Sequence, residues 1–374
     1  MHKFSRIYIA GHQGLVGSAI VRKLQDSGYE NLIGRTHAEL DLTRQAEVEA
    51  FFEKERPEFV FLAAARVGGI LANSVYKAEF IYQNIMIAAN VIHASYKCNV
   101  KKLLNLGSSC IYPKFAPQPM REEYLLTGSL EPTNEPYAVA KISAIKLCRY
   151  FNEQYGTNFI SVMPANLYGI NDNFDLETSH VLPALIRKMH LGKCLENGDF
   201  RSVRSDLQRR PVRNHDVNKM TDKEIVNLLF KYGIRCNYPG SQIPVVQNSE
   251  PETHNPELTT TVEVWGSGTP FREFLHANDL ADACVFLMEN HNAPDIGEFI
   301  NIGTGKELKI KELAEIIKKI VGFRGRIEWD TSKPDGTPRK LLSVEKINNL
   351  GWKAKIDFVD GLETVYKNYS LQDS

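Results

Sequence analysis

The sequence has no excess of charge of either sign, no long apolar run and no close pairing of cysteines. Lys plus Arg and Asp plus Glu number 45 each, so the formal net charge is zero and no global field favours nucleic acid or an anionic membrane as a partner. No uninterrupted apolar run approaches the roughly 20 residues that span a bilayer, and the first residues, MHKFSRIYIAG, lack the pattern of an export signal. The six cysteines form no CxxC pair, which argues against a zinc site and a disulfide framework. We therefore expect no metal, no nucleic acid and no membrane, and a reducing, cytoplasmic location.

The sequence does contain a regular alternation of strand-like and helical segments over residues 1–170. Apolar strand patterns fall at residues 6–10, 31–34, 59–65, 102–109 and 159–169. Helical patterns separate them, the first directly after the glycine-rich stretch at 11–17 and the others at about 44–55, 78–98 and 137–155. Strands separated by helices predict parallel βαβ units. The expected fold class is therefore α/β, with a doubly wound parallel sheet of the Rossmann type.

The second half of the chain predicts a smaller α/β domain. A helix is expected at about 180–191, followed by a polar, charge-mixed region at 198–260 in which the capping box TDKE predicts one helix. Further strands are expected at 261–268 and 298–303, helices at 278–290 and 309–321, and two short helices in the tail. We assign residues 1–170 with about 262–302 to a cofactor-binding domain. Residues 171–261 and 303–374 are assigned to a substrate-binding domain.

The stretch GHQGLVG places Gly11, Gly14 and Gly17 after a strand and at the start of a helix. In that context small residues let the backbone N–H groups and the helix N-terminus approach a pyrophosphate, which predicts dinucleotide binding. At the end of the second strand stands Arg35, where an acidic residue would favour NAD, so a 2′-phosphate and hence NADP are favoured. Asp41 suits the adenine edge or, equally, the cap of the next helix.

Tyr137 and Lys141 stand four residues apart at the start of a predicted helix, and residues at this spacing share a face. An ammonium about 4 Å from a phenol would stabilise the tyrosinate by about 4 kcal/mol at an effective dielectric near 20. This predicts that Lys141 lowers the pKa of Tyr137 from about 10 toward 7, making it an acid or base near neutrality. Ser108 and Ser109 end a predicted strand, at the edge where open α/β sheets bind ligands.

The glycine turn, the serine at a strand end and Tyr-x-x-x-Lys, in this order, resemble the extended short-chain dehydrogenase/reductases. The segments LGSSCIYPK, NEPYAVAKI, NLYGINDNFDLETSHVLPAL, VWGSGTPFREFLHANDLADA and KPDGTPRKLL are similar to the GDP-L-fucose synthase family. The resemblance covers nearly the whole chain except about residues 198–260. It implies an enzyme that epimerises carbons 3 and 5 of GDP-4-keto-6-deoxy-D-mannose and reduces carbon 4 with NADPH.

The resemblance assigns reduction to Ser108, Tyr137 and Lys141, and epimerisation to Cys110 and His180. Ser108 would orient the carbonyl oxygen, and Tyr137 would protonate the developing alkoxide. The carbonyl at carbon 4 acidifies the protons at carbons 3 and 5, so inversion needs an acid and a base near neutrality. A thiol and an imidazole, with pKa values of about 8.5 and 6.5, are such groups. Which of them acts at each carbon stays open.

The resemblance also implies two sets of binding residues and no metal site. The set around NADP(H) is Gly11, Gln13, Gly14, Leu15, Val16, Gly17, Arg35, Asp41, Leu42, Ala63, Ala65, Leu106, Gly107, Lys141, Pro164, Asn166, Leu167 and His180. The set around the GDP-sugar is Ser109, Asn166, Lys188, Trp265, Arg272, Asp335 and Lys340. Its cations suit a diphosphate, Trp265 could pack on the nucleotide, and Asp335 could bond a hydroxyl or base edge.

Several alternatives remain open from the sequence. Gln13 stands where an arginine is common in the family, and Ser343 where an aspartate is usual. The arginine-rich insertion at 198–260 is best interpreted as a tolerated surface excursion, with a lid or an oligomer contact as the sharper alternative. A GDP-L-colitose synthase and a catalytically silent dinucleotide-binding regulator are the rival functions. The resemblance implies a homodimer in which the helices at 78–98 and 137–155 form a four-helix bundle.

Overall fold

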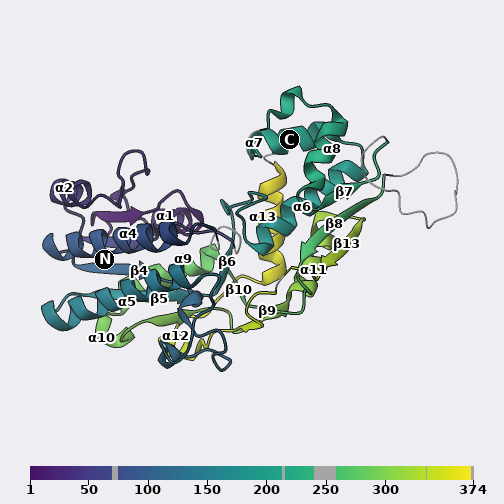
Figure 1. Ribbon diagram of the computed structural model, residues 1–374. Coiled ribbons are helices and arrows are strands. Elements are labelled where there is room, and N and C mark those ends of the chain that lie inside the picture. Colours follow the sequence, from purple (N-terminus) through teal and green to yellow (C-terminus); the bar gives the residue numbers. More distant parts are fainter. Residues whose placement is uncertain (70–74, 213–214, 240–257, 334, 372–374) are drawn as a thin grey trace. The chain divides into compact units, whose positions relative to one another are not determined.

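The computed structural model describes residues 1–69, 75–212, 215–239, 258–333 and 335–371, which form two compact units (Figure 1). Unit 1 comprises Met1–Asp172, Phe271–Glu307 and Arg339–Phe358. Unit 2 comprises Asn173–Pro270, Leu308–Pro338 and Val359–Ser374. In each unit, segments that are far apart in the sequence therefore fold together.

Unit 1 is built on a six-stranded sheet in which every strand pair is parallel, in the order β11-β5-β4-β3-β1-β2. The strands are β1 (Ile7–Ala10), β2 (Leu32–Ile33), β3 (Phe59–Leu62), β4 (Lys102–Leu106), β5 (Phe159–Pro164) and β11 (Ile300–Ile302). From β1 the chain adds β2 on one side of the sheet and then β3, β4, β5 and β11 on the other. The switch point is therefore between β1 and β3, and ligands of open α/β sheets bind at such a point. The predicted Rossmann-type α/β fold is confirmed.

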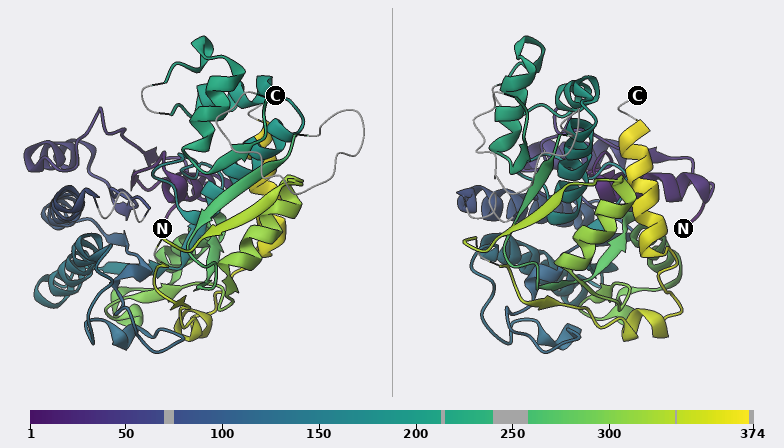
Figure 2. Two further views of the ribbon diagram at one scale, coloured as in Figure 1. Left: turned by 45° about the vertical axis from the view of Figure 1, so that its right-hand side comes forward. Right: turned by 90° about the vertical axis from the view of Figure 1, so that its right-hand side faces the viewer.

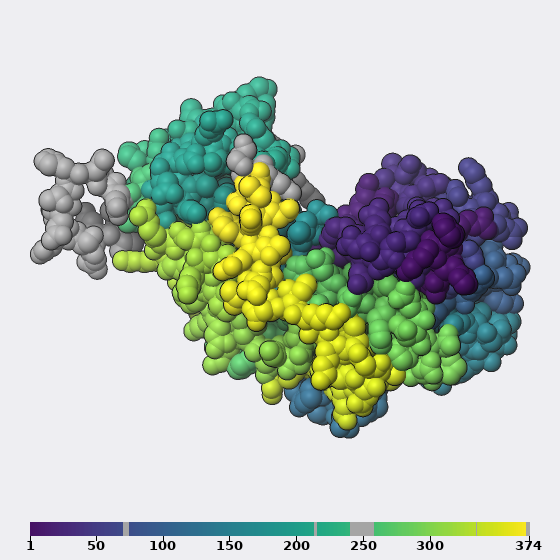
Figure 3. Space-filling model, turned by 180° about the vertical axis from the view of Figure 1, so that it is seen from behind, coloured from purple at the N-terminus to yellow at the C-terminus, as the bar shows by residue number. Residues whose placement is uncertain are grey.

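Helices cover both faces of this sheet (Figures 1 and 2). Successive side chains of a strand point to opposite faces, so Ile7 and Ile9 of β1 join a core with α1 and α9, whereas Tyr8 and Ala10 join a core with α2, α4 and α5. Because α1 packs against α9, N-terminal residues lie beside residues near position 280 on one surface (Figure 3). The helices are α1 (Leu15–Asp26), α2 (Gln45–Glu55), α4 (Lys77–Lys97), α5 (Glu135–Tyr155) and α9 (Ala277–Asn290).

Short elements complete unit 1. β6 pairs in parallel with β10, and β9 pairs in parallel with β14. These elements are η1 (Ser109–Ile111), η2 (Glu122–Tyr124), β6 (Asn166–Tyr168), β9 (Phe271–Arg272), β10 (Phe274–His276), α10 (Ala293–Ile296), β14 (Arg339–Lys340) and α12 (Glu345–Asn349).

Unit 2 has a three-stranded sheet in which β8 pairs antiparallel with β7 and parallel with β13. Helix α6 packs against β8, α7 and α11. The elements of unit 2 are α6 (Val181–Glu196), α7 (Phe200–Arg209), η3 (Val217–Lys219), α8 (Asp222–Phe230), β7 (Ile234–Cys236), β8 (Thr260–Trp265), β12 (Leu308–Lys309), α11 (Ile310–Val321), β13 (Arg326–Asp330) and α13 (Phe358–Leu371). Helix α13 has 14 residues, so the prediction of two short tail helices is wrong for this one.

The described part of the predicted insertion is not a surface excursion, which corrects the preferred interpretation of the sequence. Its helix α8 begins with the predicted capping box of Thr221 and Glu224, and α7 precedes it. Val203, Leu207 and Leu229 share a core with Leu191 and Leu195 of α6. The two helices are amphipathic, and burial of their apolar faces makes the segment part of unit 2. Arg213 lies outside the described residues.

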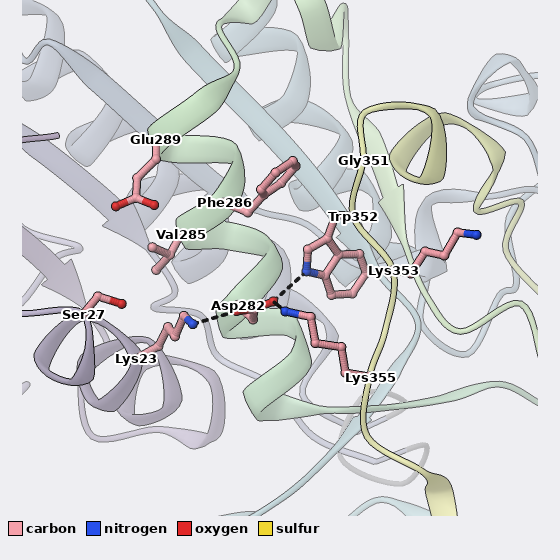
Figure 4. Close-up of a pocket in the computed structure, with 10 residues that line it drawn as sticks. All are labelled: Lys23, Ser27, Asp282, Val285, Phe286, Glu289, Gly351, Trp352, Lys353 and Lys355. Carbon is pink, nitrogen blue, oxygen red and sulfur yellow. Dashed lines mark hydrogen bonds and ion pairs between the residues drawn. The ribbon is translucent and has the colours of Figure 1, made fainter.

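The domain boundaries also differ from those expected. Strand β8, predicted to belong to the cofactor domain, lies in the sheet of unit 2, because its partners β7 and β13 are there. Residues 339–358, predicted to belong to the substrate domain, lie in unit 1. One anchor is Asp282 of α9, which accepts hydrogen bonds from Trp352 Nε1 (2.9 Å) and Lys355 Nζ (2.8 Å) and pairs with Lys23 of α1 (2.7 Å; Figure 4).

Three features of the described residues concern membrane spans, metal sites and disulfides. None of their helices is both long enough and apolar enough to cross a bilayer. Within the same residues, no group of three or more His, Cys, Asp or Glu side chains is arranged to hold a metal ion. All six cysteines are free thiols, and five of them are buried.

Candidate active site

The glycine turn joins β1 to α1 at the carboxyl edge of the sheet. Gly11 has a φ of +82°, and a Cβ there would lie 2.9 Å from the Ala64 backbone, whereas a Cβ at Gly17 would lie 2.0 Å from Gly11 O. Packing therefore requires glycine at both positions. At Gly14 the nearest atom to a Cβ would be 3.5 Å away, so packing does not require glycine there. Open space at Gly14 is what the close approach of a pyrophosphate to the backbone would require.

The start of α1 has the character of an anion site. Gly14 caps the helix without a side-chain hydrogen bond, and the first turn contains no acidic residue. The N–H groups and the dipole at such a helix start favour phosphate. Gln13 and Gly14 are exposed, and Leu15 and Val16 are partly exposed, so four residues of the predicted set can contact a pyrophosphate from outside the core.

Arg35 follows β2 and is held in place by two side-chain hydrogen bonds. Its guanidinium donates to Gly34 O (2.7 Å) and to Glu55 Oε1 (2.7 Å), and it lies over the Phe51 ring. A partly exposed, oriented guanidinium fits a 2′-phosphate. Asp41 accepts from the N–H (2.9 Å) and hydroxyl (2.8 Å) of Thr43, so its side chain caps the turn before α2.

Ser108, Ser109 and Cys110 lie directly after β4, where η1 begins. The Ser108 hydroxyl caps this short helix by accepting from Cys110 N at 3.4 Å. Ser109 and Cys110 are each 6% exposed, whereas Ser108 is partly exposed. A Cβ at the preceding Gly107 would lie 2.1 Å from the Met163 side chain, so glycine lets β4 end close against β5. The structure thus places two hydroxyls and one thiol at the predicted edge.

Tyr137 and Lys141 lie on one face of α5, which packs against η1. A proline in the first turn starts this helix, in keeping with its fixed φ. Lys141 Nζ donates to Leu106 O at 2.7 Å and lies 5.7 Å from the centroid of the Tyr137 ring. Lys141 is 8% exposed, and burial lowers its pKa to about 8. The carbonyl of Leu106 therefore fixes the ammonium beside the phenol.

The pKa of Tyr137 differs from the sequence-based prediction. Burial raises the pKa of the phenol, and the nearby Cys110 acts in the same direction. The prediction that Lys141 lowers it to near neutrality is wrong for this structure, because the ammonium donates to a carbonyl and desolvation outweighs its field. The phenol consequently stays protonated over the neutral range, which suits a proton donor rather than a base.

Two predicted substrate cations, Arg272 and Lys340, lie opposite each other on β9 and β14. Burial lowers the pKa of the Lys340 ammonium, while the neighbouring Cys110 raises it and the like charge of Arg272 lowers it further. Burial raises the pKa of the Cys110 thiol, and Lys340 opposes that shift. The structure therefore brings a buried thiol and cationic side chains together within unit 1.

Three of the predicted substrate residues, Lys188, Trp265 and Asp335, lie in unit 2. Lys188 of α6 donates to Glu263 O (3.1 Å) on β8, and burial lowers its pKa to about 8. Trp265, at the end of β8, is 52% exposed. Asp335 accepts from Ser267 N (2.9 Å) and from the Ser267 hydroxyl (2.7 Å), so it is tied to the turn that follows β8. These three side chains thus come from neighbouring parts of one small sheet and its flanking helix.

The other predicted residues occupy strand ends or loops. His180 is exposed at the N-cap of α6 in unit 2. Ala63 and Ala65 follow β3, Pro164 ends β5 and Leu167 lies in β6, all in unit 1. Leu42 is buried and its carbonyl accepts from Asn90 Nδ2 at 2.9 Å. Asn166 Nδ2 donates to Glu273 O at 2.8 Å, so its side-chain amide is bonded to the backbone just before β10.

Sequence analysis did not identify Glu273, which is fully buried between Arg272 and β10. The available signal was a carboxylate flanked by aromatic residues in the strand-like stretch FREF. An acidic residue in such a pattern costs free energy unless hydrogen bonds satisfy it. The pattern does not reveal which groups satisfy it.

Comparison with known proteins agrees with this geometry. The chain is 50% identical over 367 residues to GDP-L-fucose synthase 1 of Arabidopsis thaliana, covering 98% of this chain and 94% of that protein. It is 32% identical over 358 residues to a GDP-L-colitose synthase of Yersinia pseudotuberculosis, covering 96% and 95%. A solved GDP-D-glycero-L-gluco-heptose synthase from Campylobacter jejuni, in the presence of NADPH, is 40% identical with a TM-score of 0.84, covering 99% of both chains.

A family model, described as the NAD dependent epimerase/dehydratase family, matches residues 7–211 and 232–303. The match includes the glycine turn, η1, α5 and the predicted acid–base residues. It covers more than half of the chain, and the relatives cover nearly all of it. The chain belongs to the NAD dependent epimerase/dehydratase family.

Proposed function

We propose that the chain is a bifunctional enzyme that epimerises carbons 3 and 5 of GDP-4-keto-6-deoxy-D-mannose and reduces carbon 4 to give GDP-L-fucose. The observation that carries the proposal is the cluster at the end of β4, where Ser108 and Cys110 lie against the helix that presents Tyr137 and Lys141. The Arabidopsis relative, 50% identical and named GDP-L-fucose synthase, supports the choice of sugar.

The cofactor is NADP(H). The glycine turn and the open N-terminus of α1 fit a pyrophosphate, and Arg35 fits a 2′-phosphate. When bound, NADPH supplies the hydride that reduces carbon 4 of the sugar. The remaining predicted cofactor residues stay predictions. The positions of Ala63, Leu106 and Pro164 at the carboxyl ends of β3, β4 and β5 support them.

In the reduction, Ser108 orients the oxygen on carbon 4 and Tyr137 donates its proton to that oxygen. The raised pKa of the buried phenol keeps this proton in place at neutral pH. Lys141 stabilises the tyrosinate that remains, because its ammonium is already fixed beside the ring by Leu106 O. Positioned proton transfer of this kind contributes roughly 10²–10⁴-fold to a rate.

In the epimerisation, Cys110 exchanges a proton with the activated carbons, and His180 is the second acid–base residue. Cys110 is supported by its position after β4 beside Ser108 and by the neighbouring Lys340, whose charge opposes the rise in thiol pKa that burial causes. The assignment of His180, and of Lys188, Trp265 and Asp335 to the guanosine end, rests on the sequence motif. Arg272 and Lys340 are proposed to contact the diphosphate.

The test is turnover of GDP-4-keto-6-deoxy-D-mannose with NADPH in heavy water. We expect NADPH oxidation and GDP-L-fucose carrying deuterium at carbons 3 and 5, read by nuclear magnetic resonance. The keto precursors of GDP-L-colitose and of a GDP-heptose, run in parallel, should turn over more slowly. Efficient reduction without deuterium at either carbon would eliminate the epimerase half of the proposal.

A matched pair of variants separates the two half-reactions. Tyr137→Phe should lower reduction by about 10²-fold or more while deuterium exchange continues. Tyr238→Phe, in unit 2 where the ring packs on Phe200, should leave both unchanged. Loss of exchange and reduction together in Tyr137→Phe would contradict the separate roles of Tyr137 and Cys110.

We further propose that the enzyme is a homodimer formed through α4 and α5. The two helices pack on each other and leave Tyr82, Tyr150 and Tyr155 between 47% and 63% exposed. Aromatic side chains of this kind are enriched in subunit interfaces. The cytoplasmic location remains a prediction.

A further inference from the structure

Glu273 is a buried carboxylate for which the proposed reaction has no use. It follows β9 directly and has no exposed surface. Its pKa is raised by burial, and hydrogen bonds from the backbone act in the opposite direction. A carboxylate is retained in such a place when it satisfies groups that have no other acceptor.

The carboxylate accepts hydrogen bonds from two separate segments of the chain. Oε1 accepts from Thr304 N (2.6 Å) and Gly305 N (2.7 Å), and also from the Thr304 hydroxyl at 3.4 Å. Oε2 accepts from Leu342 N at 2.8 Å. A Cβ at Gly303 would lie 2.3 Å from Oε1, so the turn at 303–305 is closed around this side chain.

These bonds fix the backbone immediately beyond both predicted diphosphate cations. Lys340 lies opposite Arg272 in the β9–β14 pair; Glu273 follows Arg272, and Leu342 is two residues beyond Lys340. After Lys340 the chain turns toward Met120, which donates to Leu341 O (2.7 Å) and accepts from Ser343 N (2.8 Å). Leu342 is 2% exposed, so water cannot replace the carboxylate as the acceptor for its N–H.

The main chain of Glu273 is held as well. Its carbonyl accepts from Asn166 N (3.2 Å) and from Asn166 Nδ2 (2.8 Å). The residue after Arg272 is thus fixed through both its carbonyl and its carboxylate. Arg272 and Lys340 carry like charges and act on each other electrostatically, so their spacing needs support from the backbone.

We propose that Glu273 is a positioning residue that holds Arg272 and Lys340 at the spacing needed to bind the diphosphate of the GDP-sugar. The inference rests on the proposed function. A glutamine cannot replace Glu273, because it has one acceptor oxygen where the carboxylate has two. In either orientation, its NH₂ group faces backbone N–H donors, at Leu342 in one and at Thr304 and Gly305 in the other. The amide oxygen would take the two donors of the turn, and the segment that carries Lys340 would be released.

The first experiment compares steady-state kinetics of the full chain with those of Glu273→Gln. We expect the KM for GDP-4-keto-6-deoxy-D-mannose to rise about tenfold, the scale of one lost hydrogen bond to a charged group. The KM for NADPH should stay unchanged. Glu345→Gln, an exposed carboxylate on α12 in the same unit, is the matched control and should change neither constant.

A double-variant cycle separates positioning from a general structural role. If Glu273 acts through Lys340, Glu273→Gln should change the KM of a Lys340→Ala protein by less than about twofold, since coupled sites are not additive. An undiminished tenfold effect in the Lys340→Ala background would overturn the proposal.

Glu273→Asp gives a second variant should the glutamine form fail to fold. It keeps the charge but is one methylene shorter, so it reaches only one of the two segments, and an intermediate rise in KM is expected. Normal turnover with an unchanged KM in the aspartate and glutamine variants would refute the role of Glu273 alone. A wild-type chain that does not reduce the keto sugar would instead refute the proposed function.

Discussion

Lys141 combines a fixed position with a shifted pKa, and this makes the pH dependence of reduction predictable. Burial lowers the pKa of its ammonium to about 8, so the charge that stabilises the Tyr137 phenolate is present below that pH and lost above it. We expect kcat/KM for the keto sugar to fall about tenfold per pH unit above this value. The raised pKa of Tyr137 excludes the phenol as the source of this limb.

Two arginine variants identify the titrating group. Lys141→Arg should be slower, because a guanidinium has a different shape, but its profile should lose the alkaline limb, because arginine stays charged. Lys188 also has a pKa lowered to about 8, so Lys188→Arg is the control that should keep the limb. If the alkaline limb persists in Lys141→Arg and disappears in Lys188→Arg, the titrating group is Lys188, and the prediction for Lys141 is wrong.

At the scale of elements, a buried ion pair joins α6 to α7, the first helix of the segment that the sequence predicts as an insertion. Arg187 and Asp206 have no exposed side-chain surface, and Arg187 Nε donates to Asp206 Oδ1 at 2.9 Å. Arg210 and the Tyr369 hydroxyl of α13 also bond to Asp206. The network therefore connects three helices of unit 2 around one carboxylate.

Removal of that carboxylate should destabilise unit 2. Asp206→Ala leaves Arg187 buried without its counter-charge, and we expect the free energy of unfolding to fall by about 3 kcal/mol or more. Urea denaturation followed by circular dichroism measures the change. Lys223→Ala, at an exposed position of α8 in the same segment, should unfold almost as the wild type does. Equal midpoints for Asp206→Ala and wild type would contradict the role of this network.

For the whole molecule, the two units have separate hydrophobic cores. One core joins Ile9, Leu104 and Leu280 in unit 1, and another joins Leu191, Leu207 and Leu229 in unit 2. We therefore expect two transitions in calorimetry. NADPH at about a hundredfold excess over its Kd stabilises the unit that binds it by roughly 2.7 kcal/mol. It should therefore raise the transition temperature of unit 1.

The Asp206→Ala variant assigns the transitions independently. It should lower the transition that NADPH does not shift. A single transition, or equal shifts of both transitions by NADPH, would show that the units unfold together and would contradict this prediction.

Local signals explain how much of the fold could be predicted. The strand, glycine turn and helix at residues 7–26, the helix that follows Pro136 and the capping box at Thr221 each depend on a few adjacent residues. The residues after β4 and the Tyr137–Lys141 spacing follow from those elements. The order of strands and the two-faced core confirm the fold expected from the alternation.

Non-local contacts explain what could not be predicted. Strand β8 belongs to unit 2 because of the strands it pairs with, and residues 339–358 belong to unit 1 through anchors such as Asp282. The charge state of Tyr137 depends on how deeply α5 and η1 bury it. The sequence by itself determined the elements and the kinds of chemical group at their ends, since periodicity and turn chemistry act over a few residues. Only the tertiary structure decided which distant backbone groups a carboxylate such as Glu273 satisfies, because desolvation and hydrogen bonding depend on what surrounds a group in space.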